Sequence, residues 1–157
     1  MNKSGYLSAI KSMHEFFNNS TRCLSEQDSG FYPVSGTYTV AQQVAHVAHV
    51  IDWFIEGAFR PEGFALDFEE QDKRIRAVKS LEAARDWFGK SVANAVEAIN
   101  SRSEGEWSEP LPAGPVLGGQ PRSVIIGGIC DHSAHHRGAL TVYARLLGKV
   151  PSMPYGG

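Results

Sequence analysis

The histidines are the residues of this chain whose types and spacing could do chemistry. His132 and His136 stand four residues apart in the segment DHSAHHRGAL. On a helix, residues four apart lie one turn apart on the same face, so both imidazoles could reach one metal ion. Ring nitrogens suit zinc, nickel, iron or copper better than calcium or magnesium. The pair therefore indicates a site for one divalent transition-metal ion.

The helix expected around this pair, from about Pro121 to Leu147, turns both rings toward the interior. At about 100° of rotation per residue, both rings fall within an apolar stripe. The stripe consists of Ile125, Ile129, Leu140, Tyr143 and Leu147. Two buried imidazoles without an acidic neighbour in that stripe leave polar atoms that need partners, and a metal ion would supply one. The alternative is a pair of hydrogen-bonded or solvent-edge histidines.

A metal ion held by two histidines needs at least one more ligand, and the other histidines are the candidates. His46 lies at the border of the apolar face of an expected helix that starts near Thr39. His49 is rotated almost to the opposite face. We therefore expect it to be exposed, or to contact a metal-binding residue without binding the metal itself. His14 is a rival of His46, because it lies on the apolar face of the first expected helix. A hydrogen-bonded core position is the more frequent outcome for such a histidine.

Four segments with helical periodicity must position these residues, and none shows convincing strand alternation. They begin near residues 4, 39, 80 and 121, and the first is expected to end near residue 26. Thr39 and Gln42 form a capping-box pattern at the second start. Such segments predict an all-α four-helix bundle, in one domain over residues 1–157. A connection of roughly 18 residues between the second and third helices could span the bundle and permit an up-down-down-up order.

Composition indicates which classes of partner are excluded and in which cellular compartment the protein is expected. The chain has 157 residues, 42 % of them hydrophobic and 20 % charged, and a net charge of −2. No lysine or arginine cluster marks a basic segment, so we expect no nucleic-acid partner. The longest strongly apolar stretch, Val124 to Cys130, is too short to span a bilayer, and the N-terminus lacks a secretory pattern. With two well-separated cysteines, the chain is expected to be soluble and cytoplasmic, without a membrane partner.

Two segments resemble a known family. Asp131 to Leu140 resembles the HxxxHRGQ signature on the last helix of the DinB-like, damage-inducible metal-binding proteins, and TYTVAQQVAHVAHVIDWF resembles their second helix. The resemblance implies an up-down-down-up bundle, a three-histidine site for nickel, zinc or a similar ion, and frequent homodimers. Carried over by position, the implied ligands are His46, His132 and His136. The chain departs from the pattern at Ala139, where the family often has glutamine.

The resemblance also suggests reactions. Some members are thiol S-transferases that use mycothiol or bacillithiol, and three histidines leave open positions on a metal, as in catalytic sites. We expect activation of a low-molecular-weight thiol that attacks an electrophilic substrate. Metal-dependent hydrolysis ranks lower, because it needs a general base and only Glu15 or Asp52 could approach the site. The remaining alternatives are a non-catalytic metal- or ligand-binding stress protein and a bundle whose histidines never bind metal.

Overall fold

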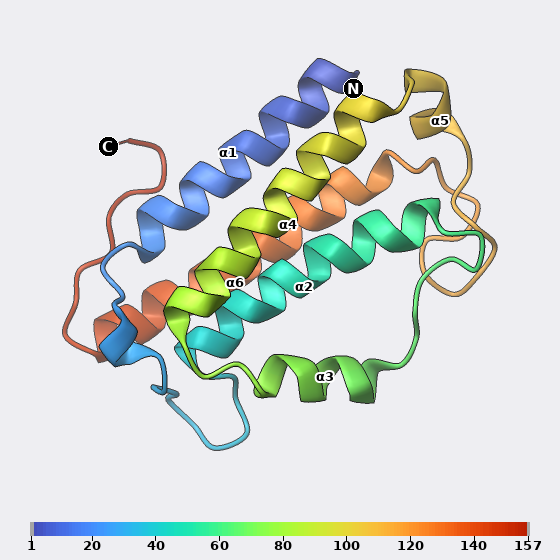
Figure 1. Cartoon of the computed structure of the whole chain (residues 1–157). Coiled ribbons are helices and arrows are strands. Elements are labelled where there is room, and N and C mark those ends of the chain that lie inside the picture. The colour runs from blue at the N-terminus through green and yellow to red at the C-terminus, as the bar shows by residue number, and fades with distance from the viewer. Residues whose placement is uncertain (1, 157) are drawn as a thin grey trace.

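Four long helices form the body of the protein. The computed structural model describes residues 2–156. The long helices are α1 (Lys3–Thr21), α2 (Val40–Phe59), α4 (Leu81–Ser101) and α6 (Val124–Leu146). Figure 1 shows that α2 and α4 run in the same direction, opposite to α1 and α6. This confirms the all-α four-helix bundle with an up-down-down-up order. Three short helices lie in the connections: η1 (Glu26–Asp28), α3 (Phe68–Arg76) and α5 (Glu104–Ser108).

The core lies between the four long helices and is closed at one end by α5. Trp107 of α5 is fully buried. Its ring lies 5.5 Å from that of Tyr6 on α1 and 5.0 Å from that of Phe59 at the end of α2. Burial of such a side chain contributes roughly 1.5–3 kcal/mol to the stability of the fold. The short helix therefore anchors the loop that leads into α6. Helix α6 carries two of the three implied metal ligands, His132 and His136.

A glycine brings α6 close to α2. A Cβ atom at Gly128 would lie 2.9 Å from the ring of Phe54 on α2, which is closer than real Cβ contacts allow. Gly128 lies one helical turn before His132, on the side of α6 that meets α2. The absence of a side chain there lets the two helices approach, so that histidines on both can meet.

Helix α2 begins with the capping box that the sequence predicts. The Thr39 hydroxyl oxygen accepts from the Gln42 backbone N–H at 3.3 Å, and the Gln42 side-chain oxygen accepts from the Thr39 N–H at 3.0 Å. We expect Thr39→Ala to lower the free energy of unfolding by about 1 kcal/mol, because the Gln42 backbone N–H loses its partner. Urea denaturation measures this change. Thr37→Ala in the exposed loop is the control, and an equal loss there would contradict the role of the cap.

The first helix is shorter than the sequence predicts. It ends at Thr21 rather than near Glu26, and its last residues before that end are Asn18, Asn19 and Ser20, which are weak helix formers. Ser25 then starts the separate helix η1, where the Asp28 carboxylate accepts from the Ser25 N–H at 2.6 Å. This local cap competes with continuation of α1, which is why the prediction was wrong by one turn or more.

Helix α3 lies in the connection between α2 and α4, where the sequence predicts no helical segment. In Figure 1 it runs beneath α2, outside the four-helix bundle, and it packs against α2. The Asp67 side chain caps its first turn, acidic residues follow at the start and basic residues stand at the end, as the helix dipole favours. Ile75 is its one buried side chain. The helix covers a face of α2 that would otherwise meet solvent.

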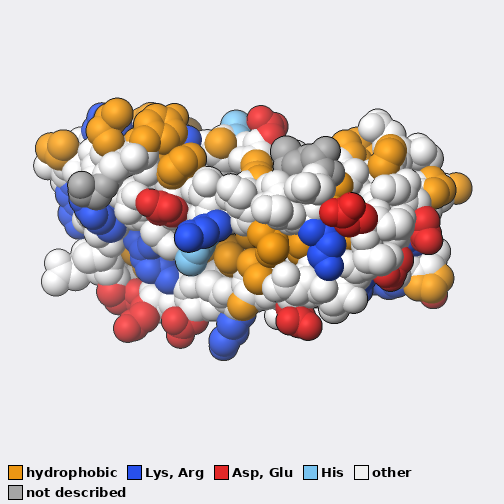
Figure 2. Space-filling model, turned by 90° about the horizontal axis from the view of Figure 1, so that it is seen from above, with side chains coloured by type: hydrophobic (Ala, Val, Ile, Leu, Met, Phe, Trp, Pro, Cys, Tyr) orange, Lys and Arg blue, Asp and Glu red, His pale blue; other side chains and the backbone are white. Residues whose placement is uncertain are grey.

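The surface seen from above α1 mixes the two signs of charge. Figure 2 shows acidic and basic side chains interspersed there, with hydrophobic side chains between them.

None of the helices among residues 2–156 combines the length and apolar content that a bilayer crossing requires. 

Candidate metal site

The structure brings His46, His132 and His136 together, and we call them the histidine triad. One ring nitrogen of each lies within 4.8 Å of those of the other two. The Nε2 atoms of His46 and His132 are 3.1 Å apart. Two ligands about 2.1 Å from a tetrahedral zinc ion lie roughly 3.4 Å from each other. The three residues could therefore hold one metal ion after small side-chain adjustments, while ligation itself stays a prediction.

The triad is held in the neutral form. Burial, followed by the neighbouring histidines, lowers the pKa of His132 to about 4 and that of His136 to about 3. Burial lowers the pKa of His46 to about 4 as well. Neutral imidazole is the form that donates a lone pair to a metal. The His46 Nδ1 atom is also buried without a hydrogen-bond partner. Three uncharged rings, one of them with an unpartnered buried nitrogen, fit a bound cation.

The metal-free protein is expected to lose stability as the pH falls from about 6.5 toward 4. The triad rings have an ordinary pKa of 6.5 when unfolded and lowered values when folded. The unfolded chain therefore binds more protons in this window, and protonation favours unfolding. Thermal denaturation in chelator at several pH values measures the effect. Replacing all three rings with glutamine should flatten this dependence, and an unchanged slope would contradict the assignment.

A chain of hydrogen bonds sets the tautomer of His136. The Tyr143 hydroxyl contacts the Tyr38 carbonyl oxygen at 3.1 Å, and because a carbonyl only accepts, the hydroxyl must donate. The Gln43 amide nitrogen donates to the same hydroxyl at 3.1 Å, which turns the Gln43 oxygen toward His136. That oxygen lies 2.5 Å from His136 Nδ1, which must carry the proton. The lone pair of His136 is then on Nε2, available to a metal.

Sequence reasoning missed Gln43, although one signal pointed to it. Gln43 is a buried polar residue between the apolar residues Val40 and Val44 of α2. A polar side chain on such a face needs an internal partner, which a histidine on a facing helix can provide. The polar neighbour of the last ligand thus comes from α2, and not from position 139, where the chain has alanine.

Sequence reasoning also missed the acidic residue beside the site. Asp72 of α3 accepts from the Tyr38 hydroxyl at 2.5 Å and from Arg76 Nε at 2.7 Å. These bonds lower the pKa of Asp72, while burial and then Asp72 raise the pKa of Tyr38 to about 12. The Tyr38 ring lies 5.2 Å from that of His46. Asp72 is therefore an ionised carboxylate with both oxygens engaged, which makes it a weak base.

The remaining histidines lie outside the triad. His49 is buried rather than exposed, and its Nε2 lies 3.0 Å from the Gln71 side-chain oxygen, because α3 covers its face of α2. His14 is half-buried with its ring 5.3 Å from Phe88, a core position rather than a ligand. His135 is exposed and touches the ring of His136 from outside.

Asp52, one of the two expected bases, is engaged elsewhere. Its carboxylate accepts from the Trp87 indole N–H at 2.8 Å, which ties α2 to α4. Glu15, the other, is exposed on α1. Neither acidic residue is part of the metal-binding group formed by the triad.

The whole chain is similar to known proteins of one family. Residues 6–157 match the DinB family. The crystal structure of a DinB-like protein from Bacillus cereus superposes with a TM-score of 0.75 at 21 % identity, covering 96 % of both chains. YfiT from Bacillus subtilis, described as a probable metal-dependent hydrolase with an unusual four-helix bundle topology, gives 0.70 at 13 % identity, covering 94 % of this chain and 88 % of YfiT. No curated protein matches. This chain belongs to the DinB family.

Proposed function

We propose that this protein holds one divalent zinc, nickel or iron ion at the histidine triad and activates a low-molecular-weight thiol for transfer to an electrophile. The observation that carries the proposal is the convergence of three neutral ring nitrogens from two helices, with one tautomer fixed by Gln43. A cation bound there would lower the pKa of a thiol or water that completes its coordination. Three uncharged ligands leave its charge uncompensated, which favours an anionic partner.

The reaction would proceed by nucleophilic substitution. The thiol loses its proton to solvent, and the sulfur lone pair forms a bond to an electrophilic carbon. In a substitution, the leaving group departs with the electron pair of the broken bond. The chain's own residues hold the triad in place and keep its rings neutral; they take no proton in this scheme.

The carboxylate nearest the triad in its effect, Asp72, is already hydrogen-bonded, and this favours a thiol over water as the nucleophile. The negative charge of Asp72 is close enough to His46 to raise the pKa of that ring against the larger effect of burial. Both oxygens of Asp72 already accept hydrogen bonds. A thiol has an ordinary pKa of about 8.5 and ionises near neutral pH with modest help. Water has a pKa of about 15.7 and depends far more on a metal and on a base. Thiol activation therefore does not require a general base among the residues that line this site.

Metal-dependent hydrolysis is the second candidate, and the similarity to YfiT favours it. The same triad would serve an activated water, and a hydrolase of this kind would act on an ester or amide without any thiol. The two candidates share the metal site and differ in the nucleophile. They are separated by the requirement for a thiol.

A paired assay tests the proposal. Protein loaded with zinc, nickel or iron is mixed with bacillithiol, mycothiol or cysteine and a chromogenic aryl halide, and in parallel with a nitrophenyl ester alone. We expect leaving-group release above the uncatalysed rate with a thiol, and loss of that excess in His46→Ala. Ester cleavage without thiol would assign hydrolysis instead. Equal rates for wild type and His46→Ala in both assays would reject catalysis and leave a binding protein.

A further inference from the structure

A cavity of about 280 Å³ lies between α2 and α3 and includes His46 in its wall. Its apolar wall is formed by Val50 and Trp53 of α2 and by Phe68 and Ile75 of α3. Phe68 keeps 58 % of its surface exposed, and its ring lies 6.4 Å from that of Trp53. The two rings contact each other at the cavity wall, and the exposed surface of Phe68 leaves an aromatic face that another flat group could contact.

Most polar groups of this cavity already have partners, although the buried Nδ1 atom of His46 does not. The Trp53 indole N–H donates to the Ala65 carbonyl at 2.8 Å. The Gln71 amide donates to the same carbonyl at 3.0 Å, and its oxygen contacts His49. Asp72 is engaged by Tyr38 and by Arg76. An anionic ligand would lie near the Asp72 carboxylate and could gain at most one neutral partner, His46 Nδ1, so its loss of water would cost free energy.

We propose that the α2–α3 cavity binds the uncharged aromatic part of the electrophilic substrate and holds it beside the histidine triad. This inference rests on the proposed function, because the triad supplies the reacting neighbour. His46 belongs both to the triad and to the cavity wall, so a ring in the cavity would lie within one side chain of the triad. Helix α3, with Phe68 and Ile75, is then the element that selects the substrate.

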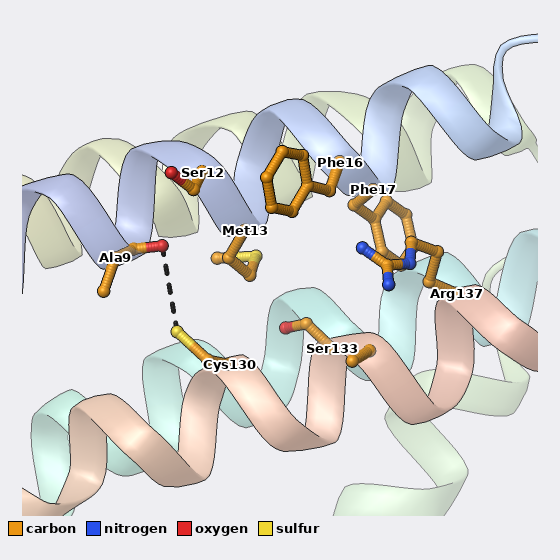
Figure 3. A pocket seen from close by; sticks show the side chains of 9 residues that line it. Ala9, Ser12, Met13, Phe16, Phe17, Cys130, Ser133 and Arg137 are labelled. Carbon is orange, nitrogen blue, oxygen red and sulfur yellow. Dashed lines mark hydrogen bonds between the residues drawn. The ribbon is translucent and has the colours of Figure 1, made fainter. Parts of the chain in front are cut away.

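A second cavity provides a matched comparison. It has a volume of about 160 Å³ and lies between α1 and α6, where Ser12 and Phe16 face Cys130 and Arg137 (Figure 3). Its lining includes none of the triad. In Figure 3 the Arg137 side chain extends from α6 toward Phe16 and Phe17. The guanidinium of Arg137 would favour an anion, whereas the α2–α3 cavity should favour a neutral ring.

Calorimetry with three probes tests the proposal, using the full chain with and without zinc. The probes are 2-naphthol, its anionic analogue 2-naphthoate, and its saturated analogue decahydro-2-naphthol. We expect one 2-naphthol to bind per chain, at least about tenfold more tightly than 2-naphthoate, because the carboxylate would be desolvated near Asp72 without a cationic side chain in the cavity lining. We expect the saturated analogue to bind roughly 2–10-fold more weakly, since it lacks a π-system.

Two variants alter the α2–α3 cavity, and a third alters the α1–α6 cavity as a control. Val50→Trp fills the space and Phe68→Ala removes an exposed wall, and both should weaken 2-naphthol binding by about tenfold or more. Phe68 is exposed, so its variant should fold normally. Ser12→Leu fills the α1–α6 cavity and should leave binding unchanged. Binding that survives in both cavity variants, or that disappears in Ser12→Leu, would overturn the proposal, as would tighter binding of 2-naphthoate.

Metal content is measured on every variant, so that the two proposals can fail separately. The cavity walls do not need a metal, and 2-naphthol should bind the metal-free chain as well. A chain that binds 2-naphthol but no metal would reject the proposed function and keep the cavity as a ligand site. A chain that binds zinc at the triad but no 2-naphthol would reject the cavity alone.

Discussion

Replacement of both α6 histidines, His132→Ala with His136→Ala, is expected to abolish stoichiometric metal binding. Two of the three ring nitrogens that lie within 4.8 Å of one another would be lost, and one imidazole cannot hold the ion alone. Residues that only orient a ligand contribute about 10–100-fold to metal affinity, so loss of two ligands should cost well over roughly 100-fold. Elemental analysis of protein purified without an affinity tag, followed by titration with zinc and nickel, measures the change.

His135→Ala is the matched control for this experiment. His135 belongs to the same helix turn, and its ring lies 4.9 Å from that of His136, yet it is exposed and outside the triad. The control should therefore keep its metal. If wild-type protein contains no metal and neither binds nor is stabilised by added zinc, nickel or iron, then the triad is a packing feature and the proposed function falls with it.

The sequence was informative about the triad because long helices have a regular period. His132 and His136 share the stripe of Ile129 and Leu140, and that stripe must face the interior of a bundle. On α2 the same reasoning placed His46 only at the border of the apolar face, so His14 remained a rival until the family resemblance was considered. Over twenty or more residues, an error of one residue in a helix boundary does not change which face is buried. The direction of the side chains was therefore predictable before their distances were.

Short elements could not be predicted in this way. Helix α3 has nine residues and one buried side chain, Ile75, so its apolar pattern is too sparse to reveal a face. Its position across α2 depends on tertiary contacts, among them the bond from Tyr38 to Asp72. Exposure, one of the two alternatives predicted for His49, was wrong for this reason, because α3 covers a face that a bundle of four helices would leave exposed.

Gln43→Met is expected to weaken metal binding by about 10–100-fold while the protein stays folded. Methionine keeps the length and much of the volume of glutamine but cannot accept the hydrogen bond from His136 Nδ1. The His136 ring would then be free to rotate or to change tautomer, and its Nε2 would no longer be held ready for the ion. Competition with a chromogenic chelator measures the affinity, and thermal denaturation in chelator measures stability separately.

Gln42→Met separates this effect from a general loss of packing. Gln42 precedes Gln43 and is also buried. Its amide nitrogen donates to the Arg76 carbonyl at 2.9 Å, and its amide oxygen caps α2 by accepting from the Thr39 N–H. Its variant should lose stability and keep metal affinity, the opposite of what we expect for Gln43. Gln43→Glu should retain most of the affinity, since a carboxylate also accepts from His136. If Gln43→Met binds zinc as tightly as wild type, then the orientation of His136 is set by packing on α6 and not by the hydrogen-bond chain through Tyr143.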